Sequence, residues 1–131
     1  MDDQVIEFAG EAVLLCAESG ARVSDPQDAL DLIGAAFGQA QTVAIPATRL
    51  DEQFFRLRSG VAGEIMQKFV NYRIRLVILG DISTHVAASD ALRDLVRESN
   101  KANHIWFLPT VDDLEARLRT RTTARNLPGR S

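Results

Sequence analysis

Polar side chains flank the apolar run at 76–79 on both sides, and their types suit binding and proton transfer. Asn71 and Arg73 come just before the run, and Asp81 and Ser83 come just after it. A carboxylate at the end of a buried strand could act as a general acid or base, or hold a cation, at the edge where open α/β sheets place their working groups. Asp81 could equally cap the loop that follows it, and no second acid or base is fixed beside it. The first hypothesis is therefore a small-molecule pocket near Asn71 and Asp81.

The helix predicted just before this run carries a second set of candidate residues. Ser59 can serve as its N-cap, a contribution of about 1 kcal/mol, while a helix start with glycines can also hold an anion. Gly60 and Gly63 indicate close packing of this helix, because glycine inside a helix costs roughly 1 kcal/mol and needs a compensating contact. Glu64 and Lys68 are four positions apart, in the order that favours a surface ion pair. The second hypothesis is a binding surface made of Ser59 and Gly60 with the exposed flank of the helix, Glu64, Gln67 and Lys68.

Metal ligation and nucleophilic catalysis find little support in the sequence. His85 and His104 are nineteen positions apart and Cys16 is distant from both, so no pair has the spacing of metal ligands. No serine lies in a G-x-S-x-G elbow, and the apolar neighbours of Cys16 predict a thiol that is part of the core. We therefore expect no catalytic residue, no bound metal and no cofactor.

Alternating apolar segments must position the candidate residues. Short apolar runs predict strands, and stripes with spacings of three and four predict helices. The predicted strands cover 5–8, 12–16, 42–45, 76–79 and 105–108, and the helices cover 24–37, 59–72, 90–99 and 110–118, with a short helical or irregular stretch at 50–57. Ser24 and Gln27 predict a capping box at the start of the first helix.

The order of these segments, β-β-α-β-α-β-α-β-α, predicts the fold class. Strands that alternate with helices indicate an α/β fold with a mixed, mainly parallel sheet of four or five strands. The run at 76–79 is apolar without alternation, so we place its strand at the centre of the sheet with both faces covered.

Length and composition fit one globular domain. The chain has 131 residues, 46% of them hydrophobic and 25% charged, and no apolar run is long enough to cross a membrane. The acidic N-terminus and the single cysteine favour a reducing, cytoplasmic location without export. We therefore predict a single α/β domain over 1–121 and no membrane association.

Charge is concentrated at the two ends of the chain. Residues 1–38 contain eight acids and one arginine, whereas residues 115–131 contain five arginines and one acid. The basic end could form an arm for nucleic acid, but no aromatic residue is interleaved with its arginines to stack on bases. We predict instead that 122–131 is a basic, disordered tail.

Two longer segments carry a resemblance to a known family. FFRLRSGVAGEIMQKFVNYRIRLVILGD, which begins at Phe54, and RDLVRESNKANHIWFLP, which begins at Arg93, resemble a bacterial family catalogued as a domain of unknown function, family 4180. The resemblance extends over most of the chain and implies no activity, because that family has none assigned.

The predicted order of elements also resembles that of STAS domains, the fold of anti-sigma-factor antagonists. In that family a strand leads into a D-S-S-G type turn at the start of a helix, and a partner kinase phosphorylates a serine there. Ser59 and Gly60 stand at the matching place, although Leu57 and Arg58 replace acidic and hydroxyl residues. This resemblance implies a non-enzymatic regulatory module that binds a protein partner or a second copy of the chain. The pocket hypothesis implies a small ligand instead, and nucleic acid fits neither.

Overall fold

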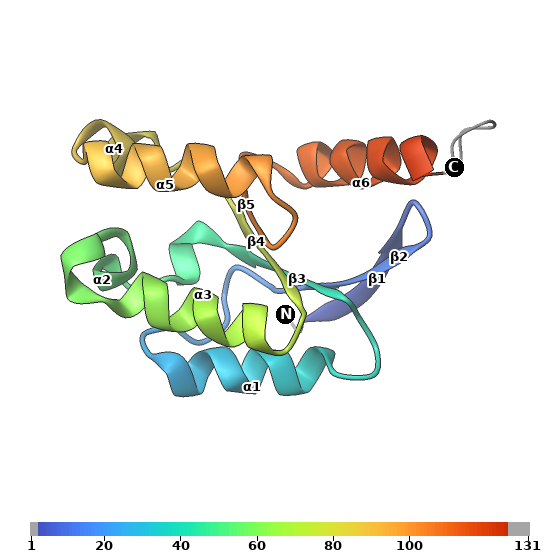
Figure 1. Ribbon diagram of the computed structural model, residues 1–131. Coiled ribbons are helices and arrows are strands. Elements are labelled where there is room, and N and C mark those ends of the chain that lie inside the picture. The colour runs from blue at the N-terminus through green and yellow to red at the C-terminus, as the bar shows by residue number, and fades with distance from the viewer. Residues whose placement is uncertain (1–2, 126–131) are drawn as a thin grey trace.

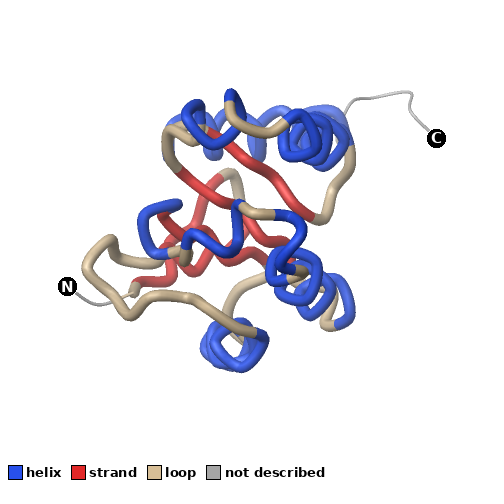
Figure 2. The backbone as a smooth tube through the Cα atoms, turned by 90° about the vertical axis from the view of Figure 1, so that its left-hand side faces the viewer, coloured by secondary structure: helices blue, strands red, loops and turns tan. Residues whose placement is uncertain are grey.

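A mixed sheet runs through the middle of the molecule (Figure 1, Figure 2). The structure is a computed structural model that describes residues 3–125, and within this range the sheet has five strands in chain order, β1-β2-β3-β4-β5. β1 is antiparallel to β2, and every later pair is parallel. The strands are β1 (Gln4–Phe8), β2 (Glu11–Leu15), β3 (Thr42–Pro46), β4 (Arg75–Leu79) and β5 (Ile105–Leu108). The predicted α/β class and mixed sheet are confirmed.

Helices connect and cover the parallel strands. Three long helices form the crossovers: α1 (Pro26–Ala36) joins β2 to β3, α3 (Val61–Asn71) joins β3 to β4, and α5 (Asp90–Lys101) joins β4 to β5, while α6 (Val111–Arg125) follows β5. Shorter helices precede α3 and α5: η1 (Ala47–Arg49), α2 (Glu52–Phe55), η2 (Leu57–Ser59) and α4 (Ser83–Ala87). α2 lies within the short stretch predicted at 50–57. In Figure 1, α1 and α3 lie side by side below the strands, and α5 and α6 lie in a row above them.

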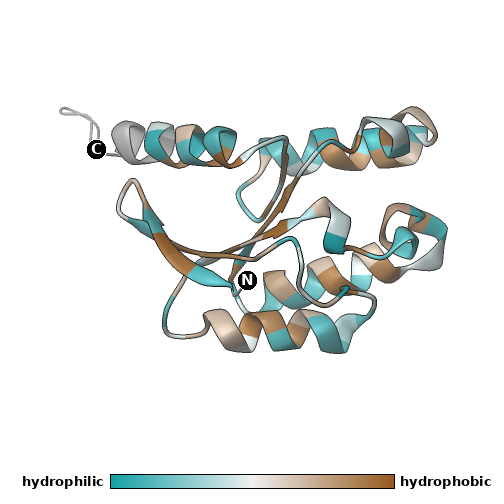
Figure 3. Cartoon of the chain, turned by 180° about the vertical axis from the view of Figure 1, so that it is seen from behind, coloured by the Kyte–Doolittle hydropathy of each residue, from teal (hydrophilic) through white to brown (hydrophobic). Residues whose placement is uncertain are grey.

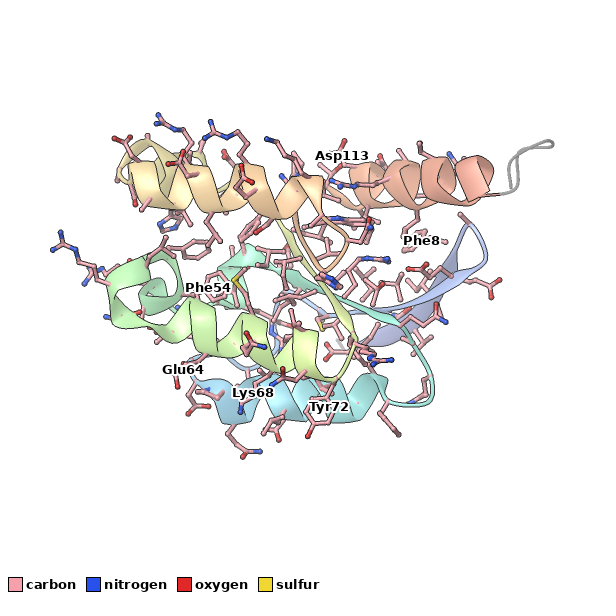
Figure 4. All side chains as sticks on the ribbon, viewed as in Figure 1. Phe8, Phe54, Glu64, Lys68, Tyr72 and Asp113 are labelled. Atoms are coloured by element: carbon pink, nitrogen blue, oxygen red, sulfur yellow. The ribbon has the colours of Figure 1, made fainter. Side chains whose placement is uncertain are left out.

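The two faces of the sheet bury different side chains, because successive residues of a strand point to opposite faces. Leu76 and Ile78 of β4 join the core formed with α1, α3 and α5. Val77 and Leu79 join a second core beneath α6, where Phe8 also packs (Figure 4). Figure 3 shows the same division as brown strands between helices that alternate brown and teal. β4 therefore lies between β3 and β5 with both faces covered, as the sequence predicted, but the middle strand of the five is β3 and not β4.

The start of α1 lies one residue later than its predicted cap. Asp25 is the N-cap, and its carboxylate accepts a hydrogen bond from the Asp28 N–H at 3.0 Å. Pro26 occupies the first helical turn, where its missing N–H costs nothing. The prediction that Ser24 and Gln27 form the capping box is therefore wrong.

The glycines of α3 do not mark a close helix contact. Gly63 is exposed, and a Cβ added there would meet no atom within 4 Å. Gly60 precedes the first residue of α3 with a φ of +80°, a left-handed conformation that glycine adopts without a steric penalty. The prediction of close packing at Gly60 and Gly63 is wrong, and backbone conformation explains the first of them.

A polar cluster joins the amino ends of the parallel strands. Arg75 of β4 forms an ion pair with Glu11 of β2 at 2.5 Å and donates a hydrogen bond to Thr42 of β3 at 3.1 Å. The guanidinium carbon of Arg75 lies 4.4 Å from the centre of the Trp106 ring, and that of Arg117 lies 4.1 Å from it. Trp106 thus contacts two cations, Arg75 from the sheet and Arg117 from α6. These two cation–π contacts stabilise the packing of α6 against the strands.

The basic end of the chain is partly built into the fold. Arg117 packs on Trp106, and Arg119 pairs with Glu115 at 2.6 Å. α6 continues to Arg125, so it overlaps the first residues of the tail predicted at 122–131. The remainder of that tail lies outside the described residues, and both its disorder and the domain boundary at residue 121 stay predictions.

Candidate functional site

The connections that leave β3 and β4 enclose a groove at the carboxyl end of the sheet. Its volume is about 570 Å³, within the range of about 300–1,000 Å³ typical of small-molecule sites. One wall comes from α2 and η2, and the other comes from α4 and the first turn of α5. Figure 1 shows these short elements together on its left side. The groove is lined by residues that include Phe55, Arg56, Leu57, Arg58, His85 and Ser89.

An aromatic pair joins the two walls. The rings of Phe55 and His85 stack with their centroids 4.1 Å apart and their planes 9° apart. Phe54 contacts Phe55 edge to face at 5.3 Å and is fully buried between α2, α3 and the strands (Figure 4). Phe54 anchors α2 in the core, and the Phe55–His85 stack therefore holds α4 at a fixed distance from α2. The groove is therefore preformed.

Two exposed arginines give the groove a positive rim. Arg56 and Arg58 line it, and in the described part of the chain neither has an ion-pair or hydrogen-bond partner. Glu52 is the acid that also lines the groove. Two guanidinium groups against one carboxylate leave a net positive surface, which attracts anions.

Ser59 and Gly60 follow this wall and lead into α3. The Ser59 hydroxyl donates a hydrogen bond to the carbonyl oxygen of Gln53 at 2.6 Å and accepts one from the Val61 N–H at 3.2 Å. The N-cap of α3 is Gly60, one residue later than the predicted cap at Ser59. Ser59 nevertheless accepts a hydrogen bond from the first N–H of the helix. The side chain is exposed. A hydroxyl is thus presented at the positive end of the α3 dipole.

Glu64 and Lys68 lie along the flank of α3 that is near α1 in Figure 4. Glu64 is exposed and Lys68 is half-buried. Among residues 3–125 no ion pair joins them, and the Glu64 carboxylate lies 4.0 Å from the point that a Cβ on Gly60 would occupy. The predicted surface pair is therefore not formed. The flank instead keeps a carboxylate near the start of the helix.

The structure does not bring together Asn71, Asp81 and Ser83, the residues of the pocket hypothesis. Asn71 and Arg73 precede β4, whereas Asp81 and Ser83 follow it. A strand as long as β4 spans about 16 Å, at roughly 3.3 Å per residue. Asn71 is exposed and accepts a hydrogen bond from the Gln67 amide at 2.8 Å. Asn71 and Asp81 therefore lie near opposite ends of β4, too far apart to line one pocket.

Arg73 has a backbone role at the end of α3. Its φ of +58° is left-handed, and the Ile74 N–H donates to the Phe69 carbonyl oxygen at 3.0 Å. The Arg73 N–H donates to the Val70 carbonyl oxygen at 3.1 Å, which completes a Schellman motif. The exposed side chain of Arg73 is not needed for this turn.

Asp81 caps the loop after β4, as one reading of the sequence predicted. Its carboxylate accepts a hydrogen bond from the Ser83 N–H at 2.9 Å. Hydrogen bonding from the Ser83 side chain, and then from its backbone, lowers the pKa of this exposed carboxyl. Asp81 and Ser83 line a cavity of about 280 Å³. A carboxylate with a lowered pKa is a weak base at neutral pH, so this site suits hydrogen bonding better than proton abstraction.

Cys16 is buried away from both candidate sites. It is 3% exposed, and burial together with the Asp3 carboxylate raises the pKa of its thiol to about 12. A thiol that stays protonated is a poor nucleophile. Across residues 3–125, no group of three or more histidine, cysteine or acidic side chains is placed to hold a metal ion.

The groove itself was not predicted from the sequence. Phe55 and His85 are thirty positions apart, in two connections that show no clear periodicity. The available signal was the segment 54–58, Phe-Phe-Arg-Leu-Arg, which places aromatic and basic residues between a strand and a helix. Paired aromatic and arginine residues in a connecting segment are typical of binding surfaces.

These features define the class: an α/β protein with a mixed five-stranded sheet across residues 3–125 and a groove at its carboxyl end. The family model described as Domain of unknown function (DUF4180) matches residues 8–118. The chain belongs to this family, which confirms the resemblance seen in the sequence. Comparisons with curated proteins and with solved structures gave no match. None of the helices within residues 3–125 is long and apolar enough to span a membrane.

Proposed function

We propose that this protein is a cytoplasmic, non-enzymatic regulatory module of STAS-like shape that acts by binding a protein partner. The parallel strands β2 to β5 in chain order, with a helix in each crossover, support the STAS-like assignment. The binding surface in this proposal is the start of α3 with its exposed flank, made of Ser59, Gly60, Glu64 and Lys68.

The exposed hydroxyl of Ser59 at the start of α3 is the observation that carries the proposal. In the proposed STAS-like topology, this position corresponds to the one at which STAS domains carry their regulatory serine. A phosphate there would add a charge of about −1.5 to −2 at the positive end of a helix dipole, next to Arg58 in the chain. The charge would lie at the favourable end of the helix dipole and would change the surface presented to a partner, at the expense of the hydrogen bond from the Ser59 hydroxyl to the Gln53 carbonyl oxygen.

The test compares two serine variants in the same structural position. Ser59 lies one residue before the N-cap of α3, and Ser24 lies one residue before the N-cap of α1, and both are exposed. A partner is captured from host lysate with the wild-type protein, purified, and titrated against Ser59→Asp and Ser24→Asp. We expect Ser59→Asp to change the Kd at least tenfold, about 1.4 kcal/mol, and Ser24→Asp to leave it unchanged. Equal affinity of both variants for the partner would refute the proposal.

The partner can be another protein or a second copy of this chain. Two large apolar side chains, Phe37 and Tyr72, are 71% and 53% exposed and follow the ends of α1 and α3, which lie side by side. Analytical ultracentrifugation of the purified protein separates these cases. A dimer that Ser59→Asp dissociates would identify the second copy as the partner.

A small ligand near Asp81 is the alternative, and the cavity beside Asp81 and Ser83 favours it. Asp81→Asn keeps the shape of the side chain and removes its charge. Native mass spectrometry of protein from its own host would detect a retained molecule. Loss of that molecule in Asp81→Asn, with full partner binding by Ser59→Asp, would replace the proposed function with this alternative.

A further inference from the structure

We propose that the groove between α2–η2 and α4–α5 binds a small organic anion that joins a planar ring to a phosphate group. The groove adjoins the partner surface, since Arg58 precedes Ser59 in η2, but the residues that line the groove are not those of the partner surface, and the proposal does not depend on that surface. Three observations carry it: two rim arginines that have no partner among the residues the structure describes, the aromatic and apolar lining, and the fixed spacing of the two walls.

Charge selects the anionic group. Arg56 and Arg58 are exposed on one wall, and within residues 3–125 no side chain or carbonyl oxygen pairs with either. A guanidinium group presents its N–H donors as a planar fork that matches two oxygens of a phosphate. A phosphate monoester near neutral pH carries almost two negative charges, which two arginines can neutralise. Glu52 on the same wall disfavours a second acidic group on the ligand.

The lining selects the planar ring. Phe55 and His85 already stack with nearly parallel planes, and Leu57 adds an aliphatic surface to the same groove. Because Phe55 is only 6% exposed and the two rings cover each other, a flat ligand ring would find its stacking partner in the half-buried His85 and its apolar contact in Leu57. The volume of about 570 Å³ leaves room for a ring and a phosphate together.

A free hydroxyl adds a polar contact on the opposite wall. Thr84 of α4 lines the groove, and across the described residues its hydroxyl has no hydrogen-bond partner. Ser89 on the same wall is already engaged, because its hydroxyl accepts from the Leu92 N–H at the start of α5. Thr84 is therefore the hydroxyl available to a ligand.

Rigidity favours binding of a small molecule. Phe54 is fully buried and holds α2, and the Phe55–His85 stack joins α2 to α4. A groove with fixed walls does not lose further conformational entropy when a ligand enters it. Such preorganisation matters most for small ligands, whose few contacts cannot offset a large ordering cost.

The test is a titration followed by two-dimensional amide NMR with phenyl phosphate as the probe. Phenol and inorganic phosphate, titrated separately, supply the ring and the charge alone. We expect phenyl phosphate to shift the amides of α2, η2 and α4 with a Kd of about 1 mM, an ordinary affinity for a probe of this size. Each fragment alone should bind at least about tenfold more weakly, because the ring and the phosphate use different parts of the groove.

Two double variants with the same change of net charge decide whether the groove is the site. Arg56→Gln with Arg58→Gln should weaken phenyl phosphate binding about tenfold or more. Arg93→Gln with Arg97→Gln removes two exposed arginines of α5, which pair with Asp90 and Asp94, and should leave the Kd unchanged. All four positions are exposed, and the amide spectrum itself reports whether each variant is folded. No shift in the groove with phenyl phosphate, or equal weakening in both double variants, would overturn the proposal.

Discussion

Gly20→Ala is expected to destabilise this protein although Gly20 is exposed. A Cβ on Gly20 would lie 2.3 Å from the guanidinium carbon of Arg49, which is only 7% exposed. That guanidinium donates hydrogen bonds to the carbonyl oxygens of Ala21 at 2.9 Å and Ala17 at 3.0 Å. The added methyl group must therefore displace a side chain that is buried and held in place.

The cost follows from the two hydrogen bonds that the displacement breaks. A hydrogen bond from a charged donor contributes about 1.5–3 kcal/mol. Two effects reduce this cost. Arg49 can partly re-pair, and alanine restricts the unfolded chain, which stabilises the folded state by about 0.4–1 kcal/mol. We expect Gly20→Ala to lower the free energy of unfolding by about 2–4 kcal/mol, measured by urea denaturation.

Gly34 supplies a matched control. It lies inside α1, it is exposed, and a Cβ there would meet no atom within 4 Å. Gly34→Ala should therefore raise the free energy of unfolding by up to about 1 kcal/mol, the difference in helix propensity between the two residues. If Gly20→Ala is as stable as the wild type, or if its cost is the same in an Arg49→Met background, the clash does not exist and the reasoning is refuted.

Three further predictions test other parts of the structure. Arg73→Gly should stabilise the protein by about 0.5–1 kcal/mol in urea denaturation, because its left-handed backbone costs an L-residue roughly 1–2 kcal/mol and glycine nothing. The pKa of Cys16 is about 12 in the folded protein, above its value of about 8.5 in an unfolded chain. The folded state therefore binds more protons between these values, and stability should fall as pH rises from about 9 to 12, by at most about 1.4 kcal/mol per pH unit more than in Cys16→Ala. Arg75→Met should cost about 3 kcal/mol, because it removes the cation that pairs with the largely buried Glu11 carboxylate, whereas Arg119→Met, which breaks an exposed pair, should cost about 0.5 kcal/mol or less. The emission of the single tryptophan, Trp106, should change only in Arg75→Met, and an unchanged spectrum with unchanged stability would contradict the role given to the cluster.

Local patterns predicted the elements that fill the core. The unbroken apolar run at 76–79 predicted a strand covered on both faces, and β4 is such a strand. Short polar residues predicted where helices begin, with an error of one position at Ser24 and at Ser59. Those errors have one cause: a cap is decided by backbone conformation as well as by side-chain type, and here Pro26 and the left-handed Gly60 set the first residue of each helix.

Local sequence patterns could not predict which connecting segments contact one another in the fold. α4 was not predicted, because it is a short helix without a buried residue and leaves no periodic signal. The pocket hypothesis joined Asn71 and Asp81 because they are close in sequence, whereas an intervening strand holds them apart. The pairing of Arg75 with Glu11 combines residues from two strands, and its register is set by the whole sheet.

The amino and carboxyl ends of the strands differ in how many of their polar side chains are hydrogen-bonded or ion-paired within the protein. At the amino edge, Arg75 and Glu11 are paired with each other and with the strands, so these residues are explained by stability. At the carboxyl edge, the connections at 47–60 and 80–89 are longer than the roughly 2–6 residues that a βα connection needs. Phe54 accounts for part of that length, since it fills the core. Arg56 and the Thr84 hydroxyl have no partner in the described part of the chain and no such role in the core, and proteins commonly place binding residues of this kind in rigidly held connections. The carboxyl edge is therefore the side of this fold at which function should be sought.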